Sequence, residues 1–333
     1  MNFSNKKTSV LVLIGGPSSE HEVSLKSGEV VFKNLDPERY AGRKILISKT
    51  GEWEEEPKNI RKNSHIAFIA MHGTYGEDGT IQALLEQEEI PYTGSDALSS
   101  ALGMNKFLST RHFKDHNLPV PFSFLISRHM WGMKPQFVLN QLRYYIGYPL
   151  VIKPNNQGSS VGVTIVQNEE ELEAALEESF KVSREALAQE YIQGRELTCG
   201  VLDHGWPESA YPLLPTEIIP QTSHFFDYRA KYEPNASLEI TPPNLPEPVI
   251  RLLQQLAVAA HRALGCSGFS RTDFMLDRTG NLYILETNTI PGLTEQSLLP
   301  KAARETGISL KELLHRVIQA GLARWERWKR KRS

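Results

Sequence analysis

The fold of this chain is decided by residues 269–276 (FSRTDFML), 277–281 (DRTGN) and 282–288 (LYILETN). Two apolar-rich runs on either side of a Gly- and Asp-containing turn predict a β-hairpin. Side chains alternate between the two faces of a strand, so Arg271 shares a face with Asp273, and Glu286 shares a face with Asn288. When the chain folds back at the turn, Asp273 comes opposite Glu286 to within about one residue of register.

Two carboxylates and one amide oxygen converge in this predicted hairpin: Asp273, Glu286 and Asn288. All three are hard oxygen ligands, and the set contains no thiolate and no imidazole. It suits Mg²⁺ that is held by few protein groups and completed by substrate phosphates and water. The alternative is a solvated hairpin face with ordinary charges, but the surrounding residues are too apolar for an exposed ribbon. The sequence therefore favours a metal site here.

The composition is that of an ordinary globular protein. The chain has 333 residues, of which 40% are hydrophobic and 23% charged, and this length allows two or three domains. Its 37 Lys and Arg residues and 39 Asp and Glu residues give a net charge of −2, so no basic excess favours nucleic acid. Basic residues concentrate at 324–332, around Trp325 and Trp328, which is typical of a solvated helix end or a frayed tail. Membrane or nucleic-acid contact is the less favoured interpretation of that segment.

Two features of the sequence indicate a cytoplasmic protein. The two cysteines, Cys199 and Cys266, lie among apolar residues, which predicts buried thiols and excludes a disulfide framework or a cysteine-based zinc site. The apolar run at residues 10–14 is too short to span a membrane. It ends in Gly-Gly-Pro and not in the small-residue cleavage site of a signal peptide. We therefore expect a cytoplasmic location and no membrane contact.

Three regions follow one another along the chain. Residues 1–100 alternate short buried apolar runs with helical stretches, which predicts a parallel α/β sheet. Residues 101–190 form a smaller α+β unit, and residues 191–333 hold further strands, the hairpin and two helices. Residues 207–246 are rich in proline and poor in periodic pattern, so we expect this stretch to include a long loop, of the kind that often acts as a lid.

Helices and further strands are predicted at the following places: a helix that carries Lys106 and runs to about residue 117, strands at 148–153 and 161–166, a helix that opens at Asn168, an amphipathic helix at 248–264, and a final helix from Ser309.

A glycine loop follows Lys153 in residues 153–162 (KPNNQGSSVG). It is not a Walker A motif, because the lysine precedes the loop, and it is not a dinucleotide fingerprint, because a strand follows where a helix should. Such a loop between antiparallel strands can fold over phosphates, because glycines let N–H groups approach an anion and the lysine adds positive charge. A plain hairpin turn is the alternative. The oxygen-only metal site further along the chain favours the nucleotide interpretation.

Seven motifs occur in a fixed order along the chain: residues 15–24 (GGPSSEHEVS), 72–80 (HGTYGEDGT), 92–95 (YTGS), 153–162, 226–232 (FDYRAKY), 271–273 (RTD) and 286–294 (ETNTIPGLT). In this order they resemble the D-alanine–D-alanine ligase family of the ATP-grasp superfamily, over nearly the whole chain. The resemblance implies a three-domain ATP-grasp fold with α/β and α+β parts and an N-terminal parallel α/β domain. It also implies that ATP phosphorylates the carboxylate of one D-alanine. The amine of a second D-alanine then attacks the acyl phosphate, which forms D-alanyl-D-alanine for peptidoglycan precursors.

The resemblance assigns the metal and phosphate contacts. Asp273, Glu286 and Asn288 would hold Mg²⁺, with two ions expected and Mn²⁺ as a substitute, which would bridge the phosphates of ATP. Lys106 and Lys153 match the phosphate-contacting lysines of the family. Ordinary surface charge is the alternative for both lysines, and it is stronger for Lys106 on its helix.

The resemblance also assigns the adenine and ribose contacts. Glu196 would hydrogen-bond the ribose hydroxyls, and Tyr191 and Ile192 would supply a flat apolar wall and backbone groups. Gln189 stands where the family usually has glutamate. Its amide oxygen can still accept a hydrogen bond from the adenine amino group, but without charge assistance.

For the peptide-forming step, Arg271 and the N–H of Gly292 would stabilise the oxyanion of a tetrahedral intermediate. A salt bridge that holds the metal carboxylates is the alternative for Arg271, and both roles can coexist. Glu20 would pair with the ammonium of the first D-alanine, with a helix-dipole role as the alternative. Ser159 and Tyr232 would hydrogen-bond with Glu20 and hold a lid that keeps water from the acyl phosphate.

Further family positions concern substrate binding and specificity. His72 would contact a substrate carboxylate, with a capped core histidine as the alternative, and Ser297 and Leu298 resemble the pocket for the second substrate's carboxylate. Lys231, beside Tyr232, fits the dipeptide-forming type, because ester-forming members carry a different lid.

Two residues depart from the family pattern, and the oligomeric state and the function each have alternatives. Arg229 and Pro243 depart from the usual glutamate and alanine of the family. A homodimer is implied by the resemblance alone. Two rivals stay open: an ATP-grasp ligase for another amino acid or hydroxy acid, and a nucleotide-binding regulator that has lost turnover.

Overall fold

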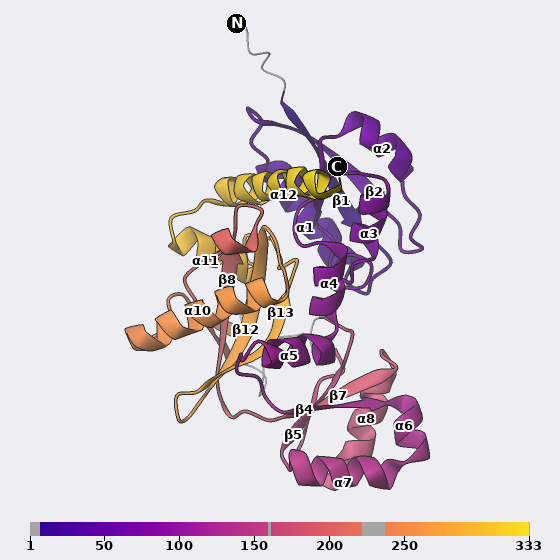
Figure 1. Ribbon diagram of the computed structural model, residues 1–333, viewed down its shortest axis with the longest axis vertical. Helices are drawn as coiled ribbons and strands as arrows, with labels where there is room; N and C mark the ends of the chain where they lie inside the picture. Colours follow the sequence, from indigo (N-terminus) through magenta and orange to yellow (C-terminus); the bar gives the residue numbers. More distant parts are fainter. Residues whose placement is uncertain (1–6, 159–160, 222–236, 333) are drawn as a thin grey trace, which may run out of the picture.

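Three β-sheets organise the chain in the computed structural model, which describes residues 7–158, 161–221 and 237–332 (Figure 1). The N-terminal sheet is parallel and has the order β2-β1-β3. Its strands are β1 (Thr8–Gly15), β2 (Tyr40–Ile47) and β3 (Ile66–Ile69), and its helices are α1 (His21–Asn34), α2 (Pro57–Asn63) and α3 (Thr80–Gln87). The central strand is fully buried over Val10 to Leu13, because helices and connections cover both of its faces. The predicted parallel α/β unit is confirmed.

The second sheet is antiparallel, has four strands in the order β4-β7-β5-β6, and has a hydrophobic core of its own. Its strands are β4 (Ser123–Ser127), β5 (Leu150–Pro154), β6 (Thr164–Val166) and β7 (Glu185–Glu190), and its helices are α6 (Arg128–Met133), α7 (Pro135–Tyr145) and α8 (Leu172–Phe180). Asn168 caps the 3₁₀ turn η1 (Glu169–Glu171) that leads into α8, close to the helix start predicted from the sequence. Two helices, α4 (Ala97–Met104) and α5 (Lys106–Asp115), connect this unit to the N-terminal one.

The third sheet is the largest and runs in the order β11-β10-β8-β12-β13, with β9 paired to β8. Its strands are β8 (Gly194–Leu202), β9 (Tyr211–Pro212), β10 (Thr216–Pro220), β11 (Ser237–Ile240), β12 (Phe269–Asp277) and β13 (Leu282–Asn288); the 3₁₀ turn η2 (Pro207–Ser209) and the helices α10 (Glu247–Ala263) and α11 (Leu298–Glu305) accompany it. The stretch 207–246, for which the sequence shows little periodic pattern, contains the strands β9, β10 and β11, and the long loop expected within it stays a prediction. Residues 222–236 of that stretch lie outside the described part of the chain.

The hairpin predicted from the sequence is confirmed. β12 and β13 pair antiparallel, with Asp273 opposite Glu286 and Arg271 opposite Asn288. A register shift follows Asp273, so a β-bulge lies directly beside the acidic pair. The turn forms because Asp277 Oδ1 accepts hydrogen bonds from the N–H groups of Thr279 and Asn281, at 2.9 and 2.8 Å.

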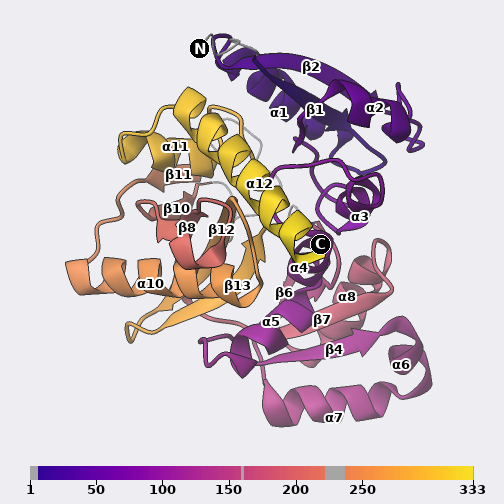
Figure 2. The same ribbon diagram turned by 45° about the horizontal axis from the view of Figure 1, so that its top comes forward.

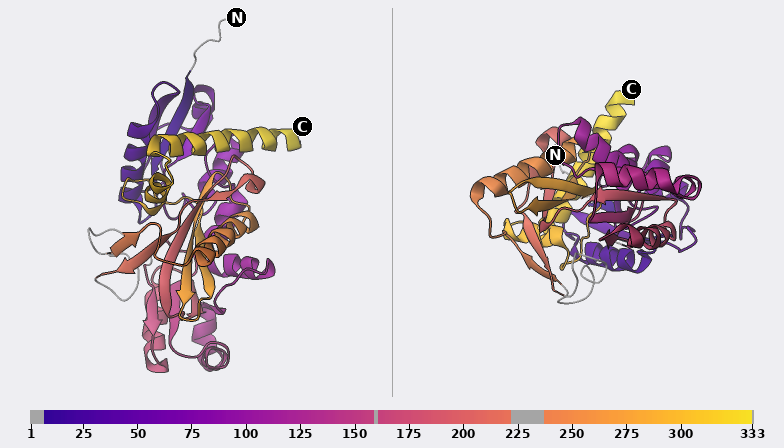
Figure 3. Two further views of the ribbon diagram at one scale, coloured as in Figure 1. Left: turned by 90° about the vertical axis from the view of Figure 1, so that its left-hand side faces the viewer. Right: turned by 90° about the horizontal axis from the view of Figure 1, so that it is seen from below.

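The last helix, α12 (Leu310–Arg332), lies between the N-terminal sheet and the third sheet, as Figures 2 and 3 show from two sides. Its residues Leu313 and Val317 are fully buried in the same core as the strands of the N-terminal sheet. On the other side, a side chain at Gly268 would touch Ala320 of this helix. Among the described residues, no helix is both long and apolar enough to cross a membrane.

The end of α12 confirms the expected solvated helix end for its later residues and corrects it for its first two. Arg324 is buried, lies over the ring of Tyr92 at 4.1 Å from its centroid, and donates a hydrogen bond to the Tyr92 carbonyl. Trp325 is 2% exposed and stacks on Trp328. Cation–π and aromatic contacts therefore hold the start of this basic segment against the N-terminal unit, whereas the helix continues with exposed side chains at 326, 327, 329 and 330.

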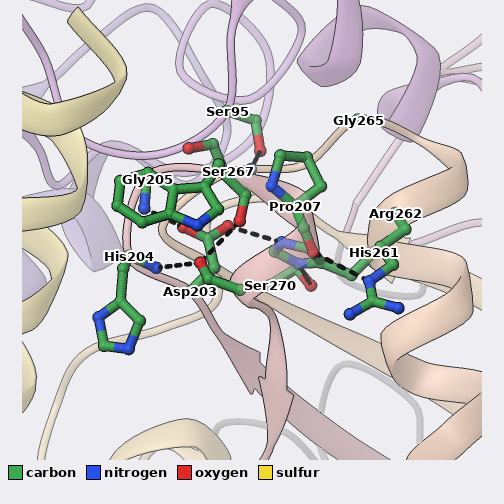
Figure 4. A network of polar contacts seen from close by, with 12 residues as sticks. Ser95, Asp203, His204, Gly205, Pro207, His261, Arg262, Gly265, Ser267 and Ser270 are labelled. Atoms are coloured by element: carbon green, nitrogen blue, oxygen red, sulfur yellow. Dashed lines mark hydrogen bonds and ion pairs between the residues drawn. The ribbon is translucent and has the colours of Figure 1, made fainter. Parts of the chain in front are cut away.

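A buried polar network joins the start of β12 to the end of β8 and to α10 (Figure 4). The ring of His261, on α10, contacts Ser270 Oγ through Nδ1 at 2.7 Å and Asp203 Oδ2 through Nε2 at 2.9 Å. Asp203 follows β8, and Ser270 precedes Arg271 on β12, so the three side chains join two strands and a helix. The set contains the residue types of a hydrolase triad, but all three side chains are enclosed in the core and a substrate cannot reach them. Its role is structural.

Asp203 gives this network a pH dependence. Burial alone would raise the pKa of Asp203, but hydrogen bonds from His261 and from the N–H of Gly205 outweigh burial and lower the pKa below its usual range. A carboxylate with a lowered pKa in the folded state stabilises the fold above its unfolded pKa of about 4, and this stabilisation is lost as the pH falls through the folded pKa.

We predict that Asp203→Asn lowers the free energy of unfolding by about 1–3 kcal/mol at pH 7, because the amide cannot replace a charged acceptor. The deficit should shrink as the pH falls through the lowered pKa of Asp203. Thermal unfolding at a series of pH values measures it, with Asp115→Asn at the exposed end of α5 as the matched control. Equal midpoints for Asp203→Asn and the wild type at pH 7 would contradict the prediction.

Candidate active site

Two adjoining cavities lie where the three sheets meet. The larger has a volume of about 450 Å³ and the smaller about 140 Å³. Lys106, Gly158 and Glu286 line both, so these residues form the border between the cavities. Every candidate residue from the sequence that the structure describes lines at least one of the two cavities: Glu20, His72, Lys106, Lys153, Gln189, Tyr191, Ile192, Glu196, Arg271, Asp273, Glu286, Asn288, Gly292, Ser297 and Leu298.

Asp273 is held by two neighbours in its own sheet. The guanidinium of Arg271 donates to both of its carboxylate oxygens, each at 2.9 Å, and Thr198 Oγ1 donates to Oδ1 at 2.6 Å. Thr198 lies opposite Asp273 on the neighbouring strand β8 and is 2% exposed. The salt bridge proposed from the sequence as an alternative for Arg271 is therefore present. Arg271 also lines the larger cavity, so its oxyanion role stays a prediction.

Glu286 pairs with a lysine from the other side of the border. Its Oε2 lies 3.1 Å from Lys106 Nζ, and Lys106 also donates to the Gln157 carbonyl at 2.6 Å. Lys106 is only 9% exposed, so the surface-charge alternative does not describe it. This lysine joins the acidic hairpin to the glycine loop.

The oxygen ligands fit a hard divalent cation. Asp273 and Glu286 lie directly opposite each other, and Asn288 Oδ1, which accepts from the N–H of Ile290 at 2.9 Å, is two residues further along β13. In the described part of the chain no group of three or more His, Cys, Asp or Glu side chains could hold a metal, and this set has only two carboxylates and an amide. Mg²⁺ accepts such a sparse protein shell, because water and phosphate complete it.

Glu20 lies at the contact between the N-terminal unit and the glycine loop. It is the N-cap residue of α1, is 8% exposed, and its backbone N–H donates a hydrogen bond to Ser18 Oγ. A methyl group added at Gly73 would lie 2.7 Å from its carboxylate oxygen, and one added at Gly158 would lie 3.2 Å away. Glycine at position 73, with φ +73°, is needed for this close approach, and glycine at 158 leaves the Glu20 carboxylate room that a methyl group would narrow. Ser159, Lys231 and Tyr232, the other predicted members of this corner, lie outside the described residues.

His72 belongs to a buried polar group in the wall of the larger cavity. Its Nε2 lies 2.8 Å from Ser27 Oγ, its Nδ1 lies 3.3 Å from Glu77 Oε1, and its backbone N–H donates to Ser24 Oγ. Burial opposes a charge on this ring, but the hydrogen bond and charge of Glu77 outweigh burial and raise the pKa of His72. Sequence reasoning missed Glu77, although it stands in the same motif as His72.

The N-terminus of α11 forms another wall of the larger cavity. Ser297 is the N-cap residue, and its hydroxyl contacts Thr294 Oγ1 at 2.8 Å and accepts from the Thr294 N–H. Leu298 is the first residue of the helix, so its N–H has no helical acceptor. A side chain at Gly292 would lie 2.7 Å from Ser297 Oγ, which accounts for glycine there. The corner offers N–H donors suited to a carboxylate.

The smaller cavity is a slot lined by aliphatic side chains and a few polar groups. Lys153 on β5 lines it and is 8% exposed. Gln189, Tyr191 and Ile192, from the end of β7 and the link to β8, line it as well, as does Glu196 on β8. This arrangement fits a flat ring joined to a sugar and an anionic tail.

The family models agree with this fold and site. One described as D-ala D-ala ligase C-terminus matches residues 112–319, and one described as D-ala D-ala ligase N-terminus matches residues 9–65 and 54–95. The chain belongs to the D-alanine–D-alanine ligase family. The resemblance stated from the motifs is thereby confirmed, as is the mixed α/β ATP-grasp fold.

Relatives of this family are similar along their whole length. A D-alanine–D-alanine ligase from Syntrophobacter fumaroxidans is 43% identical over 322 residues, which cover 96% of this chain and 99% of the relative. The crystal structure of the Bacillus anthracis D-alanine–D-alanine ligase complexed with ATP matches with a TM-score of 0.80 at 32% identity, over 96% of this chain and 99% of that one. The VanG D-Ala:D-Ser ligase from Enterococcus faecalis matches with a TM-score of 0.82 at 31% identity, over 95% and 100%.

We predict that Thr198 positions Asp273 for the cation. Thr198→Val keeps the shape but removes the hydroxyl that donates to Asp273, and the loss of such a supporting contact weakens metal binding by about 10-fold or more. Titration of Mn²⁺ followed by electron paramagnetic resonance, in the presence of ADP, measures the affinity.

Thr272→Val is the matched control, because Thr272 is buried in the same sheet and its hydroxyl contacts Thr287 instead. Equal Mn²⁺ affinity in the two variants and the wild type would show that Thr198 does not position the ligand.

Proposed function

We propose that this protein is an ATP-dependent ligase that joins two D-alanines into D-alanyl-D-alanine, for peptidoglycan precursors. The observation that carries the proposal is the shared border of the two cavities at Lys106, Gly158 and Glu286. A nucleotide in the apolar slot would extend its terminal phosphate across this border, towards a carboxylate bound in the larger cavity. Phosphoryl transfer between the two cavities needs this continuity.

In the first step, the terminal phosphoryl group of ATP passes to a carboxylate oxygen of the first D-alanine, which yields ADP and an acyl phosphate. The positive charges of Lys153 and Lys106 would hold the phosphates of ATP. The Glu20 carboxylate would orient the first D-alanine by binding the ammonium group of that substrate. Bound Mg²⁺, on Asp273, Glu286 and Asn288, would neutralise charge on the phosphates. The close packing of Glu20 against Gly73 and Gly158 supports a fixed orientation.

In the second step, the amine of the second D-alanine attacks the acyl carbon, and phosphate leaves as the C–O bond breaks. Arg271 lines the larger cavity and would stabilise the developing oxyanion together with the N–H of Gly292. The N–H groups at the start of α11, with Ser297, would hold the carboxylate of the attacking substrate. Lys231 and Tyr232 complete the proposal as lid residues, and Ser159 as the partner of Glu20, on the resemblance alone.

The proposal also covers the cellular location and the oligomeric state of the enzyme. We place it in the cytoplasm, where ATP is available, and as a homodimer, for which the family resemblance is the support. Light scattering on the purified protein decides the second point, because a single-chain mass would refute it.

The similarity to a D-Ala:D-Ser ligase motivates a second candidate substrate, D-serine, for the attacking position. Its extra hydroxyl adds little volume, and an apolar pocket rejects such an analogue only weakly. D-serine and D-lactate in competition with D-alanine separate these candidates by the mass of the product.

We predict that D-alanine stimulates the release of phosphate from ATP in the presence of Mg²⁺, with one phosphate released per D-alanyl-D-alanine formed. A coupled phosphate assay and mass spectrometry of the product measure both quantities at millimolar D-alanine. Omission of D-alanine is the control. ATP binding without D-alanine-dependent release would reject the activity and favour the regulator that has lost turnover.

We predict that Gly73→Ala removes most of this activity. The new methyl group would displace the carboxylate of Glu20 and the hydroxyl of Ser18, at a backbone φ of +73° that already disfavours alanine. Gly307→Ala is the matched control, because Gly307 has φ +82° and open space around it. Both variants should lose similar stability through strain, and only Gly73→Ala should lose turnover. Equal activity in the two would contradict the assigned role of Glu20.

A further inference from the structure

The side-chain amide of Gln189 contains a buried donor, Nε2, whose lack of a partner suggests that a ligand binds there. The side chain is 3% exposed, and its Nε2 has no hydrogen-bond partner in the described part of the chain. The residue lines the smaller cavity. A buried amide group without a partner costs about 1–3 kcal/mol, so such groups are rare unless something binds them. A ligand in the slot can supply the missing acceptor.

The backbone around Gln189 fixes where this amide sits. Gln189 pairs with Ser123 of β4 on one side and with Val151 of β5 on the other, so it lies within the ladder of the second sheet. The backbone from which its side chain starts is therefore fixed, directly beside Val151, which also lines the slot. The neighbouring acid, Glu190, also lines the slot, but it is exposed and its carboxylate accepts a hydrogen bond from the N–H of Phe122.

The slot itself suits a purine ring. Val151 and Ile165 line it from the second sheet, Val163 lines it from the connection that enters β6, and Met275 and Leu285 line it from the hairpin. Aliphatic side chains on two sides can hold a flat ring, but they do not contact the polar edge of the base. Discrimination between bases therefore depends on Gln189 and on Tyr191 and Ile192, which also line the slot.

We propose that Gln189 reads the 6-position of the purine with either end of its amide, so that the nucleotide site accepts 6-oxopurine nucleoside triphosphates as well as ATP. The inference rests on the proposed use of the slot by ATP. Rotation of the amide by half a turn presents Oε1 to the 6-amino group of adenine, or Nε2 to a 6-carbonyl oxygen, without a change of shape. An ionised glutamate at this position could only accept, and it would repel the carbonyl.

Inosine triphosphate is the sharpest probe, because it replaces the 6-amino group by a carbonyl and adds nothing elsewhere except a proton on N1. A backbone donor that faces N1 favours ATP, but it does so equally in every side-chain variant. The ratio of kcat/KM for ATP to kcat/KM for inosine triphosphate, compared between variants, therefore isolates residue 189.

The experiment measures D-alanine-dependent phosphate release with each nucleotide in the wild type and in Gln189→Glu. We expect the substitution to raise the ATP-to-inosine-triphosphate ratio by about 10-fold or more, because a donor is lost and a repulsion is added. Gln193→Glu is the matched control: it adds the same charge four positions on, at an exposed site, and should leave the ratio unchanged.

Gln189→Met covers the case in which a buried carboxylate prevents folding. Methionine has similar size but neither donor nor acceptor, so both nucleotides should lose catalytic efficiency, by about 5-fold or more each. Thermal unfolding shifts with ADP and with inosine diphosphate report binding without turnover.

The outcomes separate the two proposals. Turnover with ATP and an unchanged ratio in Gln189→Glu would overturn the inference, and the proposed function would stand. Efficiencies for both nucleotides that are unaffected by Gln189→Met would overturn it as well. Absence of D-alanine-dependent turnover with ATP in the wild type would overturn the proposed function, and the inference with it.

Discussion

The pairing of β12 with β13 brings two carboxylates, Asp273 and Glu286, directly opposite each other. Like charges at this separation repel strongly in a partly buried site unless opposite charges lie beside them. Arg271 supplies one from the same strand, and Lys106 supplies the other from α5. Lys106 also donates a hydrogen bond to the Gln157 carbonyl. The lysine that balances the acidic pair therefore connects the third sheet, the helix α5 and the glycine loop.

The border at Lys106 and Glu286 also separates two cavities whose linings differ in polarity. On one side the slot is walled by aliphatic side chains, which favour an uncharged ring. On the other side the larger cavity is lined by charged and hydroxyl groups, among them Glu20, His72 and Ser297, which suit a small zwitterion. Charged atoms of the nucleotide and of the amino acid can meet only at the border. The geometry thus separates recognition of the base from the reacting atoms.

The hairpin and its acidic pair could be predicted from the sequence because the signals are local. A two-residue period, a turn closed by Asp277 and a known strand direction fix which side chains face each other. The partners of these side chains could not be predicted in the same way. Thr198 contacts Asp273 only because β8 runs beside β12, and no local pattern sets that register.

The features that were not predicted have the same origin. Arg324 and Trp325 lie in a basic stretch that is typical of a solvated segment, until the tertiary fold places Tyr92 beneath them. The strands β9 and β10 include Pro212 and Pro220, and proline conceals short strands from a search for periodic pattern. The site residues were found through ordered motifs, and their convergence on two cavities is a property of the three-dimensional structure.

The position of α12 bears on how the chain is made. Leu313 and Val317 complete the hydrophobic core of a sheet whose strands lie near the start of the chain. On a ribosome, that first sheet emerges long before the helix that covers it, although domains generally fold as units in the order of synthesis. The N-terminal sheet must therefore wait for α12 before its core closes, and its apolar surface stays open to chaperones during that interval.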